Sequence, residues 1–469
     1  MKTNENQRGC SRRAPENNSK IACIDLLLFA ASFLLSAIIV KGTWQFAIQL
    51  SKAEKVGALM SCILGLFFFW CFEMYSVVLL KPGPTVVTAI LSSIYTFVCT
   101  FLVLLLFTRK ADYLLFLALG NVLSYFMVCL WRIALYYYHK NRTHRQKMLM
   151  IEKLQDDNSR VRRMKYACMS RFDAWYEQVD IENKERVQEF IETRFPDYDV
   201  ICLMETVPYE IRNMFMEAGL RMNKDFYVVP MMYEMNFAKV KLAYLDDVMV
   251  FHLSSTQMSA TNLFLKRTMD ILVSSMGLAV AFIPMCIIAL LIKLTSPGPI
   301  FYKQLRLTKD KKEFYIYKFR SMVQDAEKKS GPALATKDDP RITKVGHWLR
   351  KLRLDELPQL INILKGDMSV VGPRPERPFF VEQYEKEIPN YDKRFMMRAG
   401  LTALSHVYGR YSTDIIDRTH YDLLYVQNYS FMLDIRIMLL TSRTMFLSDA
   451  AEGVWTVDRR EAAKASKKA

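Results

Sequence analysis

The sequence predicts a membrane protein in three parts: a four-transmembrane-helix bundle, a small α/β domain, and a C-terminal domain with its own membrane helix. Hydrophobic residues make up 51% of the 469 residues while 24% are charged, so the apolar residues are concentrated in blocks. Four such blocks follow one another near the N-terminus, and a fifth, nearer the C-terminus, is interrupted by Pro284. These observations define the fold class.

The four N-terminal blocks are each near or above the ~20 residues that cross ~30 Å of hydrocarbon, so they predict four transmembrane helices. We place these helices at about 21–40, 56–80, 85–108 and 113–138, joined by short connections at 81–84 and 109–112. The predicted parts are a disordered basic segment 1–20, a bundle 21–139, an α/β domain 140–260, a C-terminal domain 261–450 with a membrane helix at 269–295, and a polar tail 451–469.

Charge indicates how the chain sits in the membrane. The formal net charge is +16, and two basic clusters flank the bundle, Arg12–Arg13 before it and YYYHKNRTHRQK at 136–147 after it. The positive-inside rule therefore predicts that both ends of the bundle are cytoplasmic. The basic surplus suits an anionic lipid membrane, and because no zinc-finger or RNA-binding motif is present, nucleic acid is not an expected partner.

Three ionisable residues lie within the predicted spans, where such groups are functional candidates by default. Asp25 and Arg132 lie near span ends, from which their side chains can reach the membrane surface. Glu73 lies deeper, and we expect it to act mainly as a packing or helix-pairing partner.

The middle of the chain predicts a small Rossmann-like domain. Strands are expected at 199–204 and 226–230 with a helix between them. The stretch 148–164 stands where such a domain has a strand, a Gly-rich turn and a helix, but it contains no glycine. Since the dinucleotide fingerprint requires glycine for the turn and for close approach to pyrophosphate, we expect a degenerate unit with a scaffold or regulatory role.

The fifth apolar block, Ile271 to Leu294, has two possible topologies. It is either a fifth span or a helix–break–helix that returns to the same face, because Pro284 at its centre removes a backbone hydrogen bond and kinks the helix. Basic residues flank both ends of the block, which favours the re-entrant form.

Two adjacent acids, Asp355 and Glu356, stand in LRLDELPQL after a strongly basic stretch. Taken alone, they are typical of a helix N-terminus. In order with YKFRSM (317–322), VGPRP (371–375), GLTALSHVYGRYS (400–412) and DLLYVQNYSFMLDI (422–435), however, they form a specific pattern. This pattern closely resembles the bacterial polyprenyl-phosphate sugar-1-phosphate transferases, the monotopic phosphoglycosyl transferases, over about 262–447. The bundle and α/β domain resemble the long form of that family. The resemblance also implies that the last domain is a mainly α-helical catalytic domain with a Pro-broken re-entrant membrane helix.

The resemblance implies transfer of sugar 1-phosphate from a UDP-sugar to polyprenyl (undecaprenyl) phosphate, the priming step of exopolysaccharide, capsule or O-antigen synthesis. Asp355 would attack the phosphorus next to the sugar, form an acyl-phosphate intermediate and release UMP. Asp355 and Glu356 would hold Mg²⁺, which offsets the repulsion between the carboxylate and the diphosphate. The resemblance also implies a bacterial inner-membrane protein with a cytoplasmic catalytic domain, and we expect a homodimer.

Further residues are carried over from the family pattern as substrate-binding candidates. Three cations could neutralise the diphosphate, a Pro-Arg-Pro segment is associated with nucleotide recognition, and a late acid would support the cations or the metal. They are Lys318, Arg320 and Arg350; Pro373, Arg374 and Pro375; and Asp434. The chain departs from the family at Ala399 and Ala403, where proline and glycine are common, which puts the detailed loop in question.

Two expectations complete the interpretation. The basic helix at 341–353, with apolar residues interleaved, is expected to lie along the membrane interface. The alternative function is a non-catalytic membrane scaffold or regulator of polysaccharide assembly. UMP release from a UDP-sugar would separate the two functions, and the sequence does not predict which sugar is used.

Overall fold

The computed structural model describes residues 18–42, 50–75, 82–108, 113–142, 147–153, 173–179, 183–231, 234, 240–245, 248–253, 258–323, 339, 341–409 and 413–446. The chain forms two compact units, Met1–Arg142 with Phe431–Ala451, and Thr143–Ser430 with Glu452–Ala469. The predicted N-terminal segment, apart from residues 18–20, and the predicted tail lie outside the described residues.

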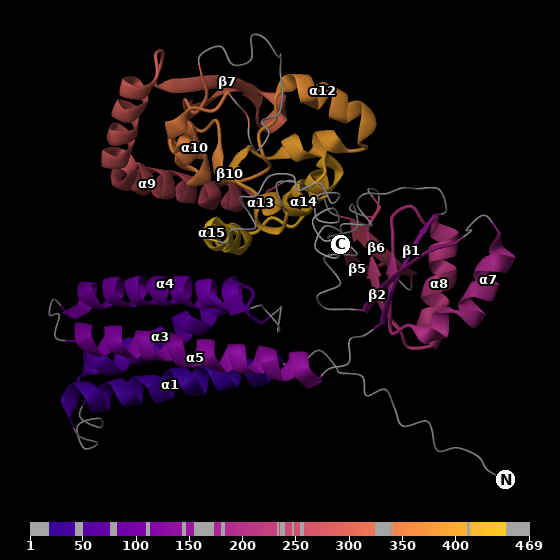
Figure 1. Cartoon of the computed structure of the whole chain (residues 1–469), viewed down its shortest axis with the longest axis horizontal. Coiled ribbons are helices and arrows are strands. Elements are labelled where there is room, and N and C mark those ends of the chain that lie inside the picture. The colour runs from indigo at the N-terminus through magenta and orange to yellow at the C-terminus, as the bar shows by residue number, and fades with distance from the viewer. Residues whose placement is uncertain are drawn as a thin grey trace, which may run out of the picture. The chain divides into compact units, whose positions relative to one another are not determined.

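The first unit is a helical bundle (Figure 1). Its helices are α1 (Asn18–Lys41), α3 (Lys52–Cys71), α4 (Pro82–Thr108), α5 (Leu114–Arg142) and α15 (Phe431–Met445). The first four are long and apolar enough to cross a membrane, which confirms the four predicted helices. The second ends at Cys71, earlier than predicted. Helix α15 packs against α3 and α4, so the unit includes a segment that we had assigned to the C-terminal domain.

The bundle encloses a buried ion pair that corrects one prediction. Asp25 and Arg132 lie in the interior, 0% and 6% exposed, with 2.5 Å between a carboxylate oxygen and a guanidinium nitrogen. The guanidinium also lies over the ring of Tyr75, 5.2 Å from its centroid. These side chains therefore pair across α1 and α5 and do not extend to the membrane surface, because two buried charges are tolerated only together.

Glu73 is a helix-pairing partner, as expected, but it does not lie inside a helix. It follows the end of α3 in a left-handed backbone conformation with φ 59°. Its carboxylate pairs with Arg436 of α15 at 3.4 Å, and that guanidinium lies 5.1 Å from the ring centroid of Trp70. The turn after α3 thus fixes α15 to the bundle.

The α/β domain is a four-stranded parallel sheet in the order β2-β1-β3-β4. Its strands are β1 (Lys147–Lys153), β2 (Asp173–Val179), β3 (Val200–Leu203) and β4 (Asp225–Val228), and its helices are α7 (Lys184–Thr193) and α8 (Tyr209–Arg221). A hairpin of β5 (Val240–Leu245) and β6 (Val248–Leu253) follows. The predicted strands and the helix between them are confirmed. The glycine-free turn falls mostly in 154–172, outside the described residues.

The C-terminal domain combines one long helix with a hairpin, a short parallel ladder and several small helices (Figure 1). The elements are α9 (Ala260–Thr295), β7 (Phe301–Leu307), η3 (Lys309–Lys311), β8 (Glu313–Phe319), α10 (Lys344–Lys351), η4 (Leu354–Glu356), α11 (Gln359–Lys365), β9 (Ser369–Val371), α12 (Pro378–Glu387), η5 (Tyr391–Met396), β10 (Gly400–Thr402), α13 (Leu404–Tyr408) and α14 (Ile415–Gln427). Strands β7 and β8 pair antiparallel, whereas β9 and β10 pair parallel.

Helix α9 bends into two limbs, and both return to this domain (Figure 1). In the first limb, Asp270 is fully buried and accepts hydrogen bonds from the hydroxyl of Ser369 and the N–H of Val370, at 2.9 and 2.8 Å. In the second limb, Ile288 and Ile292 belong to the apolar cluster that contains Phe319 and Leu349. A straight helix of 36 residues would be ~54 Å long. The bend allows one domain to hold both limbs.

Candidate active site

The two adjacent acids lie in a sharply turned segment that rests on α9. Arg353 ends the preceding helical segment with a left-handed backbone, φ 57°, a conformation that costs energy in a residue with a side chain and is frequent at functional sites. Asp355 and Glu356 then form the short helix η4, before α11 begins behind Pro358. Both acids therefore precede the first turn of α11 and do not cap it, which disfavours the purely structural interpretation.

The apolar neighbours of the acids anchor this segment. Leu354 and Leu357 pack against the cluster that includes Ile288 and Ile292 of α9 and Phe319 of β8. The Leu frame seen in the sequence therefore holds the carboxylates between the second limb of α9 and the β7–β8 hairpin. This placement is set by burial of leucine, not by the acids.

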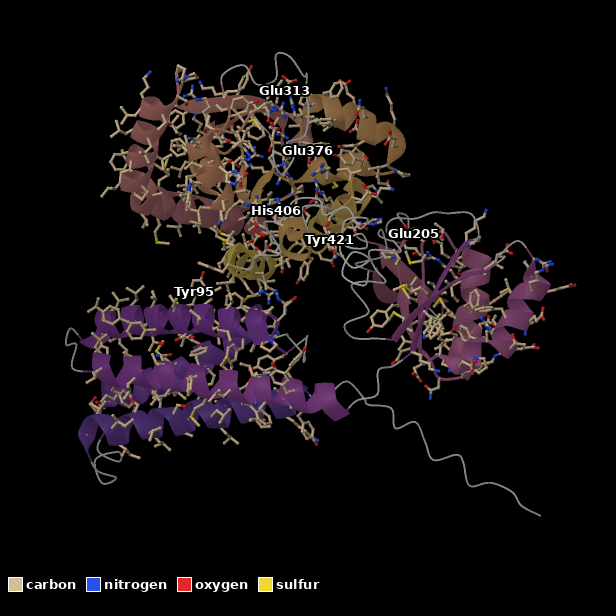
Figure 2. The ribbon with its side chains drawn as sticks, viewed as in Figure 1. Tyr95, Glu205, Glu313, Glu376, His406 and Tyr421 are labelled. Atoms are coloured by element: carbon tan, nitrogen blue, oxygen red, sulfur yellow. The ribbon has the colours of Figure 1, made fainter. Side chains whose placement is uncertain are left out.

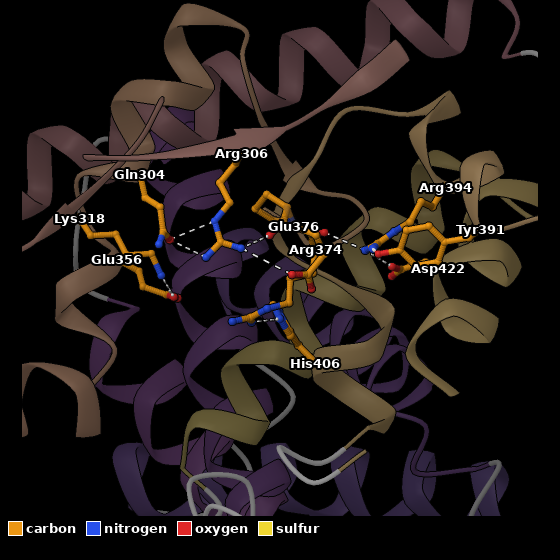
Figure 3. Close-up of polar contacts among 11 residues, drawn as sticks. Gln304, Arg306, Lys318, Glu356, Arg374, Glu376, Tyr391, Arg394, His406 and Asp422 are labelled. Carbon is orange, nitrogen blue, oxygen red and sulfur yellow. Dashed lines mark hydrogen bonds and ion pairs between the residues drawn. The ribbon is translucent and has the colours of Figure 1, made fainter. Parts of the chain in front are cut away.

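Glu356 forms an ion pair with Lys318, which extends from β8 (Figure 3). The ammonium nitrogen lies 2.9 Å from Oε1 of Glu356, and both side chains are mostly buried. Burial opposes ionisation of Glu356, but the charges of Lys318, Arg374 and Arg353 outweigh it and hold its pKa well below the usual range. Glu356 is therefore a permanent anion at neutral pH.

Asp355 has the opposite electrostatics. It is 9% exposed, and burial together with the charge of Glu356 raises its pKa to about 6, although Lys318 and Arg350 pull it down. The sequence alone suggested a value near ~4. Arg350, on α10, contributes its charge to Asp355.

The Pro-Arg-Pro segment forms the loop between β9 and α12, and its backbone is fixed by other arginines (Figure 3). Pro373 and Pro375 are buried, whereas Arg374 is partly exposed. Arg394 donates to the carbonyl of Arg374 at 2.7 Å, and Arg306 donates to that of Pro375 at 3.0 Å. The positive charge of Arg374 acts on Glu356, so the loop and the acids form one site.

A buried network behind this loop was not predicted. Arg394 pairs with Asp422 of α14 at 2.5 Å, and both side chains are 3% exposed or less. Burial opposes the charge of Arg394, but Asp422 and Tyr391 outweigh it and raise its pKa. Asp422 opens the segment DLLYVQNYS that carries the family resemblance, a signal that could have identified it. His406, which contacts Arg374 at 2.9 Å, likewise lies in the segment GLTALSHVYGRYS, whereas no sequence pattern pointed to Arg394.

Two predicted substrate-binding residues have structural surroundings of their own. Arg320 is buried and donates to the carbonyls of Ser296 and Pro297, at 2.8 and 2.6 Å, at the end of α9. It therefore stabilises the connection between α9 and β7, which gives its assignment as a neutralising cation no support. Asp434 is fully buried in α15, within the bundle unit.

The two departures from the family pattern are accommodated locally. The N–H of Ala399 donates to the hydroxyl of Thr308 at 3.1 Å, a bond that proline could not make. Ala403 has φ −142°, an extended conformation that needs no glycine. The altered loop thus retains its pairing with β9, in which Ser369 donates to the carbonyl of Ala399 at 2.8 Å.

The acids have the chemistry of a magnesium site. Within the described ranges, no group of three or more His, Cys, Asp or Glu side chains gathers around one point. Mg²⁺ does not require such a cage, because it is bound through one or two carboxylates, waters and substrate phosphates. Asp355, whose ionisation is opposed by burial and by Glu356, would be stabilised by a cation, so the donor set fits.

Figure 2 shows that Glu376 and His406 lie within the same domain as this site. Two adjacent carboxylates, one of them buried, are flanked by fixed cations in a domain built on a bent apolar helix, an arrangement that suits the class of membrane-associated transferases of phosphorylated substrates. Residues 261–448 match the model of a family described as "Bacterial sugar transferase". The chain belongs to this family, because it is also 50% and 45% identical to two curated relatives and its match covers most of the length of each.

These relatives are similar to the chain at moderate to high identity. A putative undecaprenyl-phosphate N-acetylgalactosaminyl 1-phosphate transferase of Bacillus subtilis is 50% identical over 139 residues, 30% of this chain and 77% of that protein. An exopolysaccharide production protein of Rhizobium leguminosarum is 45% identical over 188 residues, 38% of this chain and 94% of that protein. A UDP-glucose:undecaprenyl-phosphate glucose-1-phosphate transferase of Escherichia coli is 38% identical over 229 residues, 48% of this chain and 49% of that protein. The match spans about half the length of the longer relatives.

Proposed function

We propose that the protein transfers sugar 1-phosphate from a UDP-sugar to undecaprenyl phosphate, the priming step of a bacterial exopolysaccharide, capsule or O-antigen pathway. The observation that carries the proposal is the pair of carboxylates with opposite electrostatics, Asp355 and Glu356, beside Lys318 and Arg374. The relatives support it through their names, which specify undecaprenyl phosphate and sugar 1-phosphate.

In the first step, an oxygen of the Asp355 carboxylate bonds to the phosphorus next to the sugar. The bond from that phosphorus to the bridging oxygen breaks, and UMP leaves with the electron pair. In the second step, an oxygen of the lipid phosphate bonds to the same phosphorus. The acyl-phosphate bond breaks, which restores the Asp355 carboxylate and yields undecaprenyl-diphosphate-sugar.

The main barrier to the first step is repulsion between a carboxylate and an anionic diphosphate, and the cations of the site would lower it. Lys318 and Arg350 already stabilise the ionised form of Asp355, and Arg374 contributes charge from the opposite loop. Asp355 and Glu356 would hold Mg²⁺, which when bound would neutralise phosphate charge. The roles of Pro373 and Pro375 are to restrain the backbone of Arg374, so that little entropy is lost when its guanidinium meets the nucleotide.

The lipid substrate explains why such a site is built on α9. Undecaprenyl phosphate keeps its chain in the bilayer, so the nucleophile must be held at the level of the headgroups. Beside the acids, Trp348 and Leu352 are 66% and 50% exposed, which suits contact with the membrane interface. We place the catalytic domain on the cytoplasmic face of the inner membrane, where UDP-sugars are made, and expect a homodimer.

The proposal is tested by isolating the half-reaction. Purified protein is incubated with Mg²⁺ and a UDP-sugar that carries radioactive phosphorus next to the sugar, without lipid acceptor. Label should become attached to the protein at Asp355 with stoichiometric release of UMP. The Asp355→Asn variant should form no adduct and lose turnover by at least ~10³-fold.

Asp310→Asn is the matched control, because Asp310 is an exposed acid on the β7–β8 turn with φ 54°, a conformation that asparagine tolerates. It should retain wild-type activity. UMP release without an adduct, or an adduct on another residue, contradicts the mechanism. If no UDP-sugar of a panel that includes UDP-glucose and UDP-N-acetylgalactosamine leads to UMP release, the transferase function is excluded. The alternative function, a non-catalytic membrane scaffold or regulator, would then be favoured.

A further inference from the structure

Arg374 is held at its side chain as well as its backbone. Its terminal nitrogen lies 2.9 Å from Nε2 of His406, which is on the short helix α13 after β10 (Figure 3). A guanidinium has donors only, so the imidazole must accept. His406 therefore carries its proton on Nδ1 and presents a lone pair at Nε2.

The surroundings keep His406 in this acceptor form. Burial and the positive charges of Arg374 and Arg353 lower its pKa to about 3. A charged imidazole would lose the acceptor and place a second positive charge against Arg374. The contact is thus available at every pH at which the enzyme would work.

The two loops that bring Arg374 and His406 together are joined by their backbones. The N–H of Gly372 donates to the carbonyl of Thr402, and the N–H of Gly400 donates to that of Pro373, both at 2.9 Å. Neither glycine could carry a side chain, because a Cβ on either would lie within 2.3 Å of the other loop. Since the backbones are already locked, the remaining freedom at this point is that of the Arg374 side chain.

We propose that His406 is a positioning residue that fixes the Arg374 guanidinium for the nucleotide diphosphate. The competing partner is Glu356, an anion on which the charge of Arg374 already acts. Without an acceptor at position 406, the guanidinium would turn towards this carboxylate. It would then neutralise a metal ligand and leave the diphosphate without its cation. This inference rests on the proposed function and adds a residue to its substrate-binding set.

Three substitutions separate positioning from packing. His406→Gln keeps an acceptor of similar reach and should stay within about threefold of wild type. His406→Leu removes the acceptor, and His406→Asn retains one that falls short. Both should raise KM for the UDP-sugar and weaken binding of UDP with Mg²⁺ by about 10- to 100-fold, with a smaller change in kcat. Thermal unfolding in detergent identifies any variant that does not fold. If one of the leucine and asparagine variants fails to fold, the other is enough for the test.

A double-mutant cycle provides the decisive measurement. If His406 acts through Arg374, His406→Leu or His406→Asn should have almost no further effect on UDP affinity in an Arg374→Ala background. Additive losses, or a glutamine variant as impaired as the leucine variant, would overturn the inference. A wild-type protein that neither binds UDP nor releases UMP would refute the proposed function itself. Normal wild-type turnover with unaffected leucine and asparagine variants would refute only the role of His406.

Discussion

At the scale of single residues, two neighbouring carboxylates acquire different properties from their surroundings. Glu356 meets Lys318 directly and stays ionised, whereas Asp355 is pushed towards protonation by burial and by Glu356 itself. A metal ligand benefits from a permanent charge, and a nucleophile gains reactivity from an elevated pKa as long as it is ionised. In the proposed mechanism, the environments of these two adjacent residues in η4 would suit Glu356 to hold the metal and Asp355 to act as the nucleophile.

This difference predicts a specific pH dependence. Because the pKa of Asp355 is raised to about 6, the nucleophile is mostly ionised at pH 7 and becomes protonated below 6. We expect kcat/KM for the UDP-sugar to fall by about tenfold per pH unit on the acid side. Higher Mg²⁺ concentration should move this limb to lower pH, since a cation favours the ionised carboxylate. Initial rates at several Mg²⁺ concentrations test this, and a flat profile down to pH 5 would contradict it.

At the scale of elements, the position of Lys318 depends on how closely α10 approaches the end of β8. Thr343 caps α10 through the N–H of Gly346 and donates its own N–H to the carbonyl of Ser321. A Cβ at Gly346 would lie 1.9 Å from that same carbonyl oxygen. The approach thus requires glycine, and it holds the strand that carries Lys318 beside the helix that precedes Asp355.

Gly346→Ala should therefore destabilise the C-terminal domain by about 3 kcal/mol, because the clash is with backbone and cannot be relieved by a rotamer change. It should also reduce turnover by shifting Lys318 away from Glu356. The control is Gly277→Ala in α9, whose Cβ would meet only the flexible end of Leu360 at 3.3 Å. Thermal unfolding of both variants in detergent measures the effect. Equal unfolding midpoints would rule out a close approach of Gly346 to the carbonyl of Ser321.

The elements also show what a sequence can predict. The membrane helices were found because the thickness of hydrocarbon imposes a length and an apolar composition, and the acids were found because their motif is specific. The packing of α15 against the bundle was not predicted, since its 15 residues are too few to span and its partners α3 and α4 lie more than 320 residues earlier. Arg394 resembled an ordinary basic residue, and Arg320 was predicted to bind the substrate, because only the fold shows that their partners are carbonyls and a buried acid.

At the scale of the whole molecule, the bend in α9 bears on the side of the membrane on which the proposed chemistry would take place. Both limbs are bound to the same domain, the first through Asp270 and the second through Ile288 and Ile292. A straight spanning helix would break one of these sets of contacts. The re-entrant form preserves both, and it keeps the acids on the side from which α9 starts.

Labelling of introduced cysteines tests this topology. In a background without other reactive cysteines, Thr261→Cys, in the first turn of α9, and Lys309→Cys, beyond its end, are at exposed positions and should react with an impermeant maleimide from the same side of the membrane. Lys20→Cys, in the first turn of the spanning helix α1, and Gly42→Cys, directly after it, should react from opposite sides. Opposite-side labelling of the α9 pair would show that α9 crosses the membrane.

The ion pair between Glu73 and Arg436 has a consequence for biosynthesis. The turn after α3 that binds α15 is synthesised early, yet Arg436 is translated roughly 360 residues later, which takes ~20 to 70 s at usual rates of elongation. Throughout that interval, Glu73 and Trp70 do not have their contacts with Arg436. The ribosome therefore releases a protein whose membrane part is finished last, although it was begun first.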